Sequence, residues 1–289
     1  MSSKKEILKR FWRLNKRFYE DLKNKRHRYL NEGESYFENL ADNIYSQAEC
    51  YFVLSTGRTG TLLLTNVFEL SDKMDVHHVP NPELAHANNY FYQEGQSMFD
   101  AYCKVAQFSR YELIQAAYYK QQAYVETNCK VTFLARHIKE VFKKAKFIHL
   151  VRNPVGFAKS AVARGYYQNA KSDLGHIFPY REEDLKSWSE YNLYEKAAWN
   201  WEVTNQFIEE FKSELPKTDI CTIKSEELYK DVEVIKGLFD FMDKQPPQDS
   251  VLQKKISNKF NKSTPQSAFS EDDKVAILNV AKSYAAYGY

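Results

Sequence analysis

A short glycine-containing loop holds the residues whose types and spacing are best suited to chemistry. Residues 51–54 are an apolar run, residues 55–61 read Ser-Thr-Gly-Arg-Thr-Gly-Thr, and a second apolar run begins at Leu62. This pattern predicts a buried strand, a tight loop and a helix in succession. Unpaired N–H groups and the helix dipole at such a junction favour an anion, and Arg58 adds a cation. Taken alone, the loop is therefore either a phosphate or sulfate site or an ordinary turn between a strand and a helix.

A second candidate group follows residues 147–151, where another apolar run predicts a buried strand. Arg152 stands at the end of this strand, where a magnesium-dependent nucleotide hydrolase commonly has an Asp. Ser160 lies eight residues later, on the next predicted helix. An Arg and a Ser placed in this way can converge on one phosphate. Since the first loop also lacks the Lys of a Walker A sequence, having Thr61 in its place, the two groups indicate metal-free binding of two separate anionic groups.

Alternating strands and helices must position these residues. Further strands are predicted at residues 74–79, 123–127 and 219–223. Helices are predicted at residues 62–70, 84–121, 133–144, 186–213 and 232–242, with one more starting near Val155, and residues 244–270 are the most loop-like stretch. Such alternation implies a mainly parallel sheet covered on both faces, which binds ligands at the carboxyl ends of its strands. We expect an α/β, three-layer sandwich.

Composition and charge exclude several classes of protein. The 289 residues include 41 Lys and Arg and 38 Asp and Glu, and the formal net charge of +3 is too small for binding nucleic acid by bulk electrostatics. A hydrophobic fraction of 43% excludes general disorder. The sequence has no run of about 18 apolar residues, so a membrane span is not expected. It also begins without an apolar segment, so a secretory signal is not expected. The four cysteines are widely spaced and predict reduced thiols in the cytoplasm.

The first 30 residues differ in charge from the rest of the chain. They contain eleven Lys and Arg against three Asp and Glu. Their apolar residues recur at helical spacing, which predicts an amphipathic basic helix. Such a helix can pack on its own domain or lie on an anionic membrane surface, and we favour packing. We expect a basic helical extension at residues 1–48 and one further domain at residues 49–289.

Two segments resemble sulfotransferases that use 3′-phosphoadenosine 5′-phosphosulfate (PAPS). Residues 51–64, YFVLSTGRTGTLLL, look like their 5′-phosphosulfate loop, and residues 145–165, AKFIHLVRNPVGFAKSAVARG, look like their 3′-phosphate motif. Shorter matches to the bacterial branch extend the resemblance over about residues 50–289, at residues 124–128, 223–228 and 287–289. The resemblance implies a P-loop-like fold, PAPS as the sulfuryl donor without a metal, and a small-molecule acceptor.

The resemblance also implies roles for individual residues. Those around the 5′-phosphosulfate would be Arg58, Thr59, Gly60, Thr61 and Leu62. Arg152 and Ser160 would bind the 3′-phosphate, and a late segment with Lys259, Asn261 and Lys262 would close over the nucleotide. Arg58 would stabilise the charge that develops on the bridging oxygen between phosphate and sulfur.

The base that removes the acceptor's proton has several candidates. Bacterial relatives often have His-Glu-Pro where residues 78–80 of this chain read His-Val-Pro, so the usual carboxylate is missing. His78 can replace it because imidazole is suited to neutral pH. Strand alternation would point His77 and His78 to opposite faces. Glu126, at another predicted strand end, is the second candidate, and His77, Glu83 or no protein base are the others.

Two other functions are compatible with these motifs. A P-loop kinase would share the fold, although the missing Walker Lys and strand-end Asp argue against it. A catalytically silent nucleotide-binding protein would fit the missing carboxylate at Val79. The aromatic region at residues 90–124 would either border the acceptor pocket or belong to the core. Many acceptor classes fit, and we favour a small specialised metabolite since no extended basic groove is evident.

Overall fold

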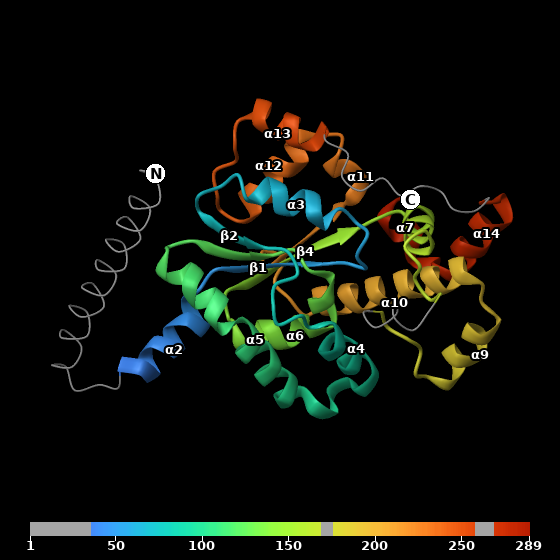
Figure 1. The fold of residues 1–289 in the computed structure, drawn as a ribbon, viewed down its shortest axis with the longest axis horizontal. Helices are drawn as coiled ribbons and strands as arrows, with labels where there is room; N and C mark the ends of the chain where they lie inside the picture. Colours follow the sequence, from blue (N-terminus) through green and yellow to red (C-terminus); the bar gives the residue numbers. More distant parts are fainter. Residues whose placement is uncertain (1–35, 169–175, 258–268) are drawn as a thin grey trace, which may run out of the picture. The chain divides into compact units, whose positions relative to one another are not determined.

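The computed structural model describes residues 36–168, 176–257 and 269–289 (Figure 1). Two compact units divide the chain, Met1–Ile44 and Tyr45–Tyr289, and helix α2 (Tyr36–Gln47) crosses their boundary. The second unit contains all the elements below. The predicted helix within residues 1–30 lies outside the described residues. None of the helices in the described ranges is long and apolar enough to cross a membrane.

The centre of the second unit is a five-stranded, wholly parallel sheet. Its strands are β1 (Cys50–Leu54), β2 (Met74–His77), β3 (Ala123–Glu126), β4 (Ala145–Val151) and β5 (Ile220–Lys224). They lie in the order β2-β3-β1-β4-β5. The chain goes from β1 to β2 and β3 on one side, then passes β1 to form β4 and β5 on the other. The carboxyl ends of β1 and β4 therefore flank the switch point at which such sheets bind ligands.

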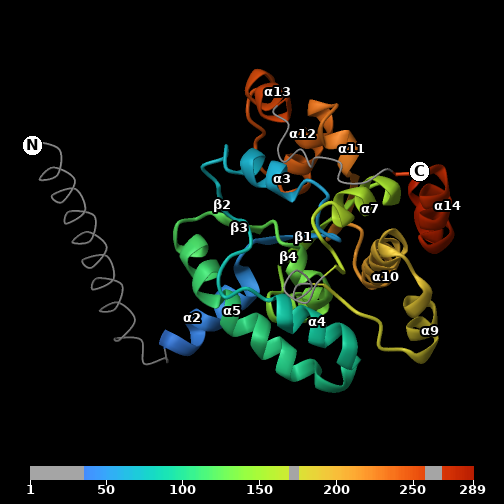
Figure 2. The ribbon, with the colours of Figure 1, turned by 45° about the vertical axis from the view of Figure 1, so that its right-hand side comes forward.

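Helices cover both faces of this sheet and give three layers (Figures 1 and 2). One face carries α3 (Thr61–Phe68), α12 (Val232–Phe241) and α13 (Asp249–Ser257), and the other carries α5 (Phe99–Tyr119), α6 (Ala135–Val141) and α10 (Leu193–Ser213). The remaining α-helices are α4 (Ala85–Glu94), α7 (Pro154–Val162), α9 (Glu182–Glu190), α11 (Ser225–Leu228) and α14 (Glu271–Val280), and η1 (Gly95–Met98), η2 (Cys129–Leu134) and η3 (Lys282–Tyr287) are 3₁₀-helices. The predicted α/β sandwich is confirmed.

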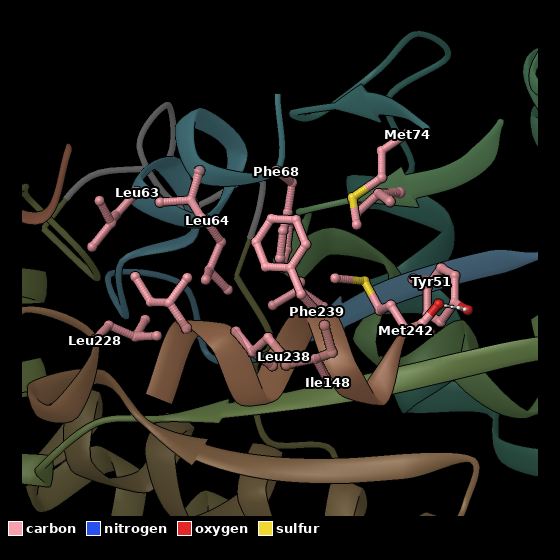
Figure 3. Close-up of a cluster of buried hydrophobic side chains, with 14 of the residues drawn as sticks. Tyr51, Leu63, Leu64, Phe68, Met74, Ile148, Leu228, Leu238, Phe239 and Met242 are labelled. Carbon is pink, nitrogen blue, oxygen red and sulfur yellow. Dashed lines mark hydrogen bonds between the residues drawn. The ribbon is translucent and has the colours of Figure 1, made fainter. Parts of the chain in front are cut away.

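A cluster of buried apolar side chains holds α3 on the sheet (Figure 3). Phe68 of α3 meets Phe239 of α12 edge to face, with ring centroids 5.8 Å apart. The Tyr51 hydroxyl on β1 donates to the carbonyl oxygen of Met242 over 2.9 Å. Each fully buried Leu or Phe in such a cluster contributes about 1.5–3 kcal/mol. The loop between β1 and α3 is therefore anchored firmly at both ends.

Two of the long predicted helices are each interrupted. Residues 84–121 form α4 and α5 with the 3₁₀-helix η1 between them. Residues 186–213 are divided between α9 and α10, since Asn192 accepts hydrogen bonds from the backbone N–H groups of Tyr194 and Glu195. The Glu195 carboxylate accepts in return from the Asn192 N–H, completing a capping box that begins a new helix.

Two other predicted boundaries were wrong. The stretch at residues 244–270 contains helix α13, whose Leu252 and Ile256 are buried in the core. The strand predicted at residues 74–79 ends at His77, and Val79 has a left-handed backbone with φ of 50°. His77 and His78 are therefore not alternating residues of one strand.

Candidate active site

The loop between β1 and α3 is wound in the left-handed backbone region. Gly57, Arg58 and Gly60 have φ angles of 76°, 55° and 98°. Backbone N–H groups in such a turn can face one concave side and form a nest for an anion. A Cβ on Gly57 would lie 3.1 Å from the Sγ atom of Cys129, and one on Gly60 would lie 3.3 Å from the Tyr229 hydroxyl. Both sites therefore favour glycine, in backbone angle and in space.

Hydrogen bonds from other elements hold this loop in place. Ser55 exchanges hydrogen bonds of 3.1 Å with the Thr132 hydroxyl, through its backbone N–H and its carbonyl oxygen. The Ser225 hydroxyl donates to the carbonyl oxygen of Thr59 over 2.6 Å. The hydroxyl of Thr59 itself is buried and has no hydrogen-bond partner among the described residues. Since buried hydroxyls normally find partners, this one fits a site that hydrogen-bonds a ligand.

Arg152 joins the end of β4 to this loop. Its Nη1 atom donates to the carbonyl oxygen of Arg58 over 2.7 Å. The side chain of Arg58 points on to α7, where its Nε atom donates to the Ser160 hydroxyl over 3.2 Å. The structure thus brings together the two motifs that the sequence singled out, although they are 94 residues apart in the chain.

Arg152 and Arg164 add positive charge around Arg58, and within the described ranges none of the three forms an ion pair with a carboxylate. Burial lowers the pKa of Arg58 below its ordinary value, and the positive charges of Arg164 and Arg152 lower it further. An arginine remains protonated despite such a shift. The arginine ion pairs in the described part of the chain belong to other residues, Arg110 and Arg136. An anionic ligand would neutralise this cluster, which agrees with the unsatisfied hydroxyl of Thr59.

The start of α7 is shaped to present Arg152. Asn153 caps the helix by accepting from the backbone N–H groups of residues 155 and 156, at 3.0 and 3.3 Å. A Cβ on Gly156 would lie 3.3 Å from the Nε atom of Arg152, so the glycine leaves room for the guanidinium. The Glu226 carboxylate accepts from the Asn153 N–H at 3.0 Å and from the Tyr289 hydroxyl at 2.7 Å. Contacts from α11 and from Tyr289 thus support the start of α7 beside Arg152.

His78 follows β2 and is exposed, with one ring nitrogen anchored. Its Nδ1 atom lies 2.8 Å from the carbonyl oxygen of Thr127. Because a carbonyl oxygen can only accept, we assign the hydrogen of the neutral ring to Nδ1. The Nε2 atom then carries a lone pair, which is the form that a general base requires. His77 instead stacks on Tyr124 at 5.0 Å and lies 3.3 Å from the Asp75 carboxylate.

Glu126 lies inside the fold with both carboxylate oxygens engaged. Arg110 binds it through two hydrogen bonds of 2.6 and 2.8 Å, and both side chains are fully buried. The Tyr124 hydroxyl and the Asn128 amide also donate to it, at 2.7 and 2.9 Å. Burial by itself would lower the pKa of Arg110, but Glu126 raises it overall. This arrangement favours a structural ion pair over the expected role of Glu126 as a base.

The structure describes some of the remaining predicted residues and leaves others outside its described ranges. Among those described, Thr61 and Leu62 occupy the first turn of α3 beside the loop, and Glu83 forms an ion pair with Lys130. The late segment with Lys259, Asn261 and Lys262 lies outside the described residues. Of the His, Cys, Asp and Glu side chains that are described, no three or more gather as a candidate metal site.

Several residues around the loop escaped sequence reasoning. Arg164 and Glu226 lie within segments that carry the family resemblance, but the sequence pattern implies no role for either residue. Ser225 and Tyr229 reach the loop from α11 and its C-terminal end, which follow β5. A short helix directly after a parallel strand was the available signal, because the end of that strand must lie at the ligand-binding edge.

Comparisons with known proteins agree with this geometry. A family model described as "Sulfotransferase domain" matches residues 48–282. Sulfotransferase STF9 from Mycobacterium avium has 10% sequence identity, a TM-score of 0.51, and coverage of 90% of this chain and 80% of its own, which shows a shared fold. Two structural matches have lower TM-scores. The sulfotransferase domain of the Synechococcus PCC 7002 olefin synthase has 14% sequence identity and a TM-score of 0.48, and the match covers 83% of this chain and 95% of that domain. A sulfotransferase from Alicyclobacillus acidocaldarius has 15% sequence identity and a TM-score of 0.49, and the match covers 82% of this chain and 92% of that protein. Curated protein sequences give no match. The family match spans most of the chain and includes both candidate anion-binding motifs, and the chain belongs to the sulfotransferase domain family.

Proposed function

We propose that this sulfotransferase moves the sulfuryl group of PAPS to a hydroxyl or amine of a small metabolite and releases adenosine 3′,5′-bisphosphate. The contact of Arg152 with the carbonyl oxygen of Arg58 supports this proposal most directly. It joins the loop after β1 to the end of β4, and both segments carry a guanidinium that lacks a carboxylate partner among the described residues. PAPS has anionic groups at both ends of its ribose, and two linked cationic sites suit such a ligand.

On the donor side, we propose one site for each anionic group. The N–H groups and hydroxyls of residues 59–62 would hold the 5′-phosphosulfate, with the unsatisfied Thr59 hydroxyl as one donor. Arg152 and Ser160 would hold the 3′-phosphate, and Lys259, Asn261 and Lys262 would close over the nucleotide. As the bond between sulfur and the bridging oxygen breaks, Arg58 would stabilise the negative charge on that oxygen.

On the acceptor side, we propose that Nε2 of His78 takes the proton. The acceptor oxygen or nitrogen attacks sulfur in line with the leaving phosphate oxygen, so one bond to sulfur forms as the other breaks. The hydrogen bond from Nδ1 to Thr127 keeps the ring in the tautomer that can accept this proton. This route uses side chains and backbone groups alone.

Labelled donor provides the direct test. PAPS labelled in its sulfur should transfer the label to a compound in a panel of phenols, alcohols and amines or in a small-molecule cell extract, with equimolar adenosine 3′,5′-bisphosphate formed. Binding of that nucleotide without label transfer would instead indicate a catalytically silent protein. Transfer of phosphate from ATP or GTP with magnesium, and none of sulfate from PAPS, would indicate a kinase.

A binding experiment tests the donor site separately. Adenosine 3′,5′-bisphosphate should raise the melting temperature more than AMP does, since AMP lacks the 3′-phosphate. Equal effects of the two nucleotides would contradict a dedicated 3′-phosphate site.

A further inference from the structure

A chain of hydroxyl groups leads from the first turn of α3 to His78. The Thr65 hydroxyl lies 3.0 Å from the carbonyl oxygen of Thr61 and 2.6 Å from the hydroxyl of Thr127. The Thr127 hydroxyl in turn lies 3.0 Å from Nδ1 of His78. Both threonine side chains are buried, whereas His78 is exposed. The chain therefore starts next to the anion-binding loop and ends at the proposed base.

One arrangement of hydrogens satisfies the four shorter contacts of this chain, and in it the 3.5 Å contact of the Thr127 hydroxyl with the carbonyl oxygen of His77 carries no hydrogen. The carbonyl oxygen of Thr61 can only accept, so the Thr65 hydroxyl donates to it. Thr65 has then used its one hydrogen and accepts from the Thr127 hydroxyl. Thr127 has likewise used its hydrogen, so both of its oxygens are acceptors for the Nδ1–H group of His78, at 2.8 and 3.0 Å. The arrangement leaves Nε2 of His78 without a hydrogen.

We propose that Thr65 and Thr127 are positioning residues that place His78 relative to the donor and hold it in the base-competent tautomer. Thr61 directly follows Gly60, so the chain ties the ring to the loop that would hold the phosphosulfate. When Nε2 takes the acceptor's proton, part of the positive charge resides on Nδ1–H, where the two Thr127 oxygens stabilise it. The inference rests on the proposed function and adds two residues to it.

Isosteric substitutions test the positioning role. Thr65→Val and Thr127→Val each remove a hydroxyl and keep the side-chain shape. Thr127→Val loses a hydrogen bond to the ring that becomes charged, so we expect kcat to fall about tenfold. Thr65→Val loses the neutral hydroxyl that holds Thr127, so we expect a smaller loss of about threefold to fivefold. The KM for PAPS and the melting-temperature shift with adenosine 3′,5′-bisphosphate should be unchanged. Thr65→Ser and Thr127→Ser restore the hydroxyl and should return kcat to within about twofold of the wild type. The acceptor is whichever compound of the panel gives the highest turnover.

A matched control separates positioning from a general loss of packing. Thr204 is also buried and donates to the side-chain oxygen of Asn200 over 3.3 Å, on α10. Thr204→Val removes a buried threonine hydrogen bond outside the proposed chain, and kcat should not change. A similar loss of kcat in this variant would attribute the effect to stability and would overturn the proposal.

A double-mutant cycle with His78→Ala decides whether the threonines act through the histidine. Once the imidazole is absent, Thr65→Val should cause no further loss of kcat. An equal loss in both backgrounds, or full activity of Thr65→Val alone, would contradict positioning. Full activity of His78→Ala would show that His78 is not the base and would remove the proposal with it. A wild-type chain that transfers no sulfate would instead refute the proposed function itself.

Discussion

The guanidinium of Arg152 donates to the backbone carbonyl oxygen of Arg58 over 2.7 Å, and the side chain of Arg58 takes no part in this bond. A substitution at residue 58 therefore keeps the anchor of Arg152, while a substitution at residue 152 leaves the side chain of Arg58 bonded to Ser160. The two cations can consequently be tested one at a time, although they belong to one network.

Arg152→Ala should remove most of the binding energy for a 3′-phosphate. A charge-assisted contact of this kind contributes about 1.5–3 kcal/mol, so we expect the affinity for adenosine 3′,5′-bisphosphate to fall roughly tenfold to a hundredfold. Titration by calorimetry would measure this loss, with AMP for comparison. Lys186→Ala removes the same charge from an exposed site on α9 and should leave the affinity unchanged. An Arg152→Ala protein that binds normally would contradict the 3′-phosphate assignment.

Arg58→Ala should slow turnover far more than it weakens nucleotide binding. The Arg58 guanidinium is expected to stabilise the negative charge that develops on the bridging oxygen as the sulfur–oxygen bond breaks. Stabilisation of developing charge by one such group commonly raises kcat by about a hundredfold to a thousandfold. The anchor of Arg152 stays in place in this variant because it uses the backbone. Steady-state kinetics should therefore show a low kcat with a nearly normal KM for PAPS. Equal losses in kcat and in nucleotide affinity would make Arg58 a binding residue only.

His78→Asn should lose activity according to the acidity of the acceptor. The Asn amide can still donate toward the Thr127 carbonyl oxygen, but it cannot take a proton. General-base catalysis commonly contributes about a hundredfold or more, and we expect that loss with alcohols. An acidic nitrophenol is already ionised and should lose much less. A uniform loss over a series of acceptors would point to a binding defect instead.

The two candidate anion motifs could be recognised in the sequence because their signals are local. Glycine spacing between two apolar runs predicts the loop after β1, and the position of Arg152 at the end of a buried strand is evident from the adjoining residues. The parallel arrangement follows from the alternation of strands and helices. These three facts suffice to bring Arg58, Arg152 and Ser160 to one edge of the sheet.

The buried ion pair of Glu126 could not be predicted in the same way, because it is a tertiary contact. Arg110 is sixteen residues away on α5, and nothing in its local sequence marks it as the partner of a strand residue. A carboxylate near a strand end can serve as a base or complete a buried ion pair, and only the surroundings decide between them. The position of His78 was similarly obscured, since strand β2 ends at His77, two residues earlier than the strand predicted at residues 74–79.

Glu126→Gln should destabilise the fold without removing catalysis from the folded protein. The substitution leaves the Arg110 charge buried without its counter-ion, and breaking a buried pair costs about 3–5 kcal/mol. For a domain of this size we expect the melting temperature to fall by about 10 °C. Glu233→Gln at an exposed pair with Lys236 is the control and should change stability little. A stable Glu126→Gln protein without turnover would restore Glu126 as the candidate base.

His137 should make the fold sensitive to acid. The ring is fully buried on α6, with ring centroids 4.1 Å from Phe91 and 4.5 Å from Phe99. Burial lowers the pKa of His137 from 6.5 to about 4. Between pH 6.5 and pH 4 the His137 ring is therefore protonated in the unfolded chain but neutral in the folded protein. The free energy of unfolding consequently decreases as the pH falls through this range. The decrease should end near pH 4, where the folded protein also takes up the proton.

His137→Leu should remove this contribution to acid denaturation. A shift of this size corresponds to about 3 kcal/mol of lost stability between pH 6.5 and pH 4. Urea unfolding of the wild type and the variant at both pH values would measure it: the difference in unfolding free energy should move in favour of the variant by about that amount as the pH is lowered. His86→Leu at an exposed site on α4 should show no such change. If the wild type and His137→Leu lose stability in parallel, the groups that drive acid denaturation lie elsewhere, and the buried ring takes up its proton without unfolding the helices around it.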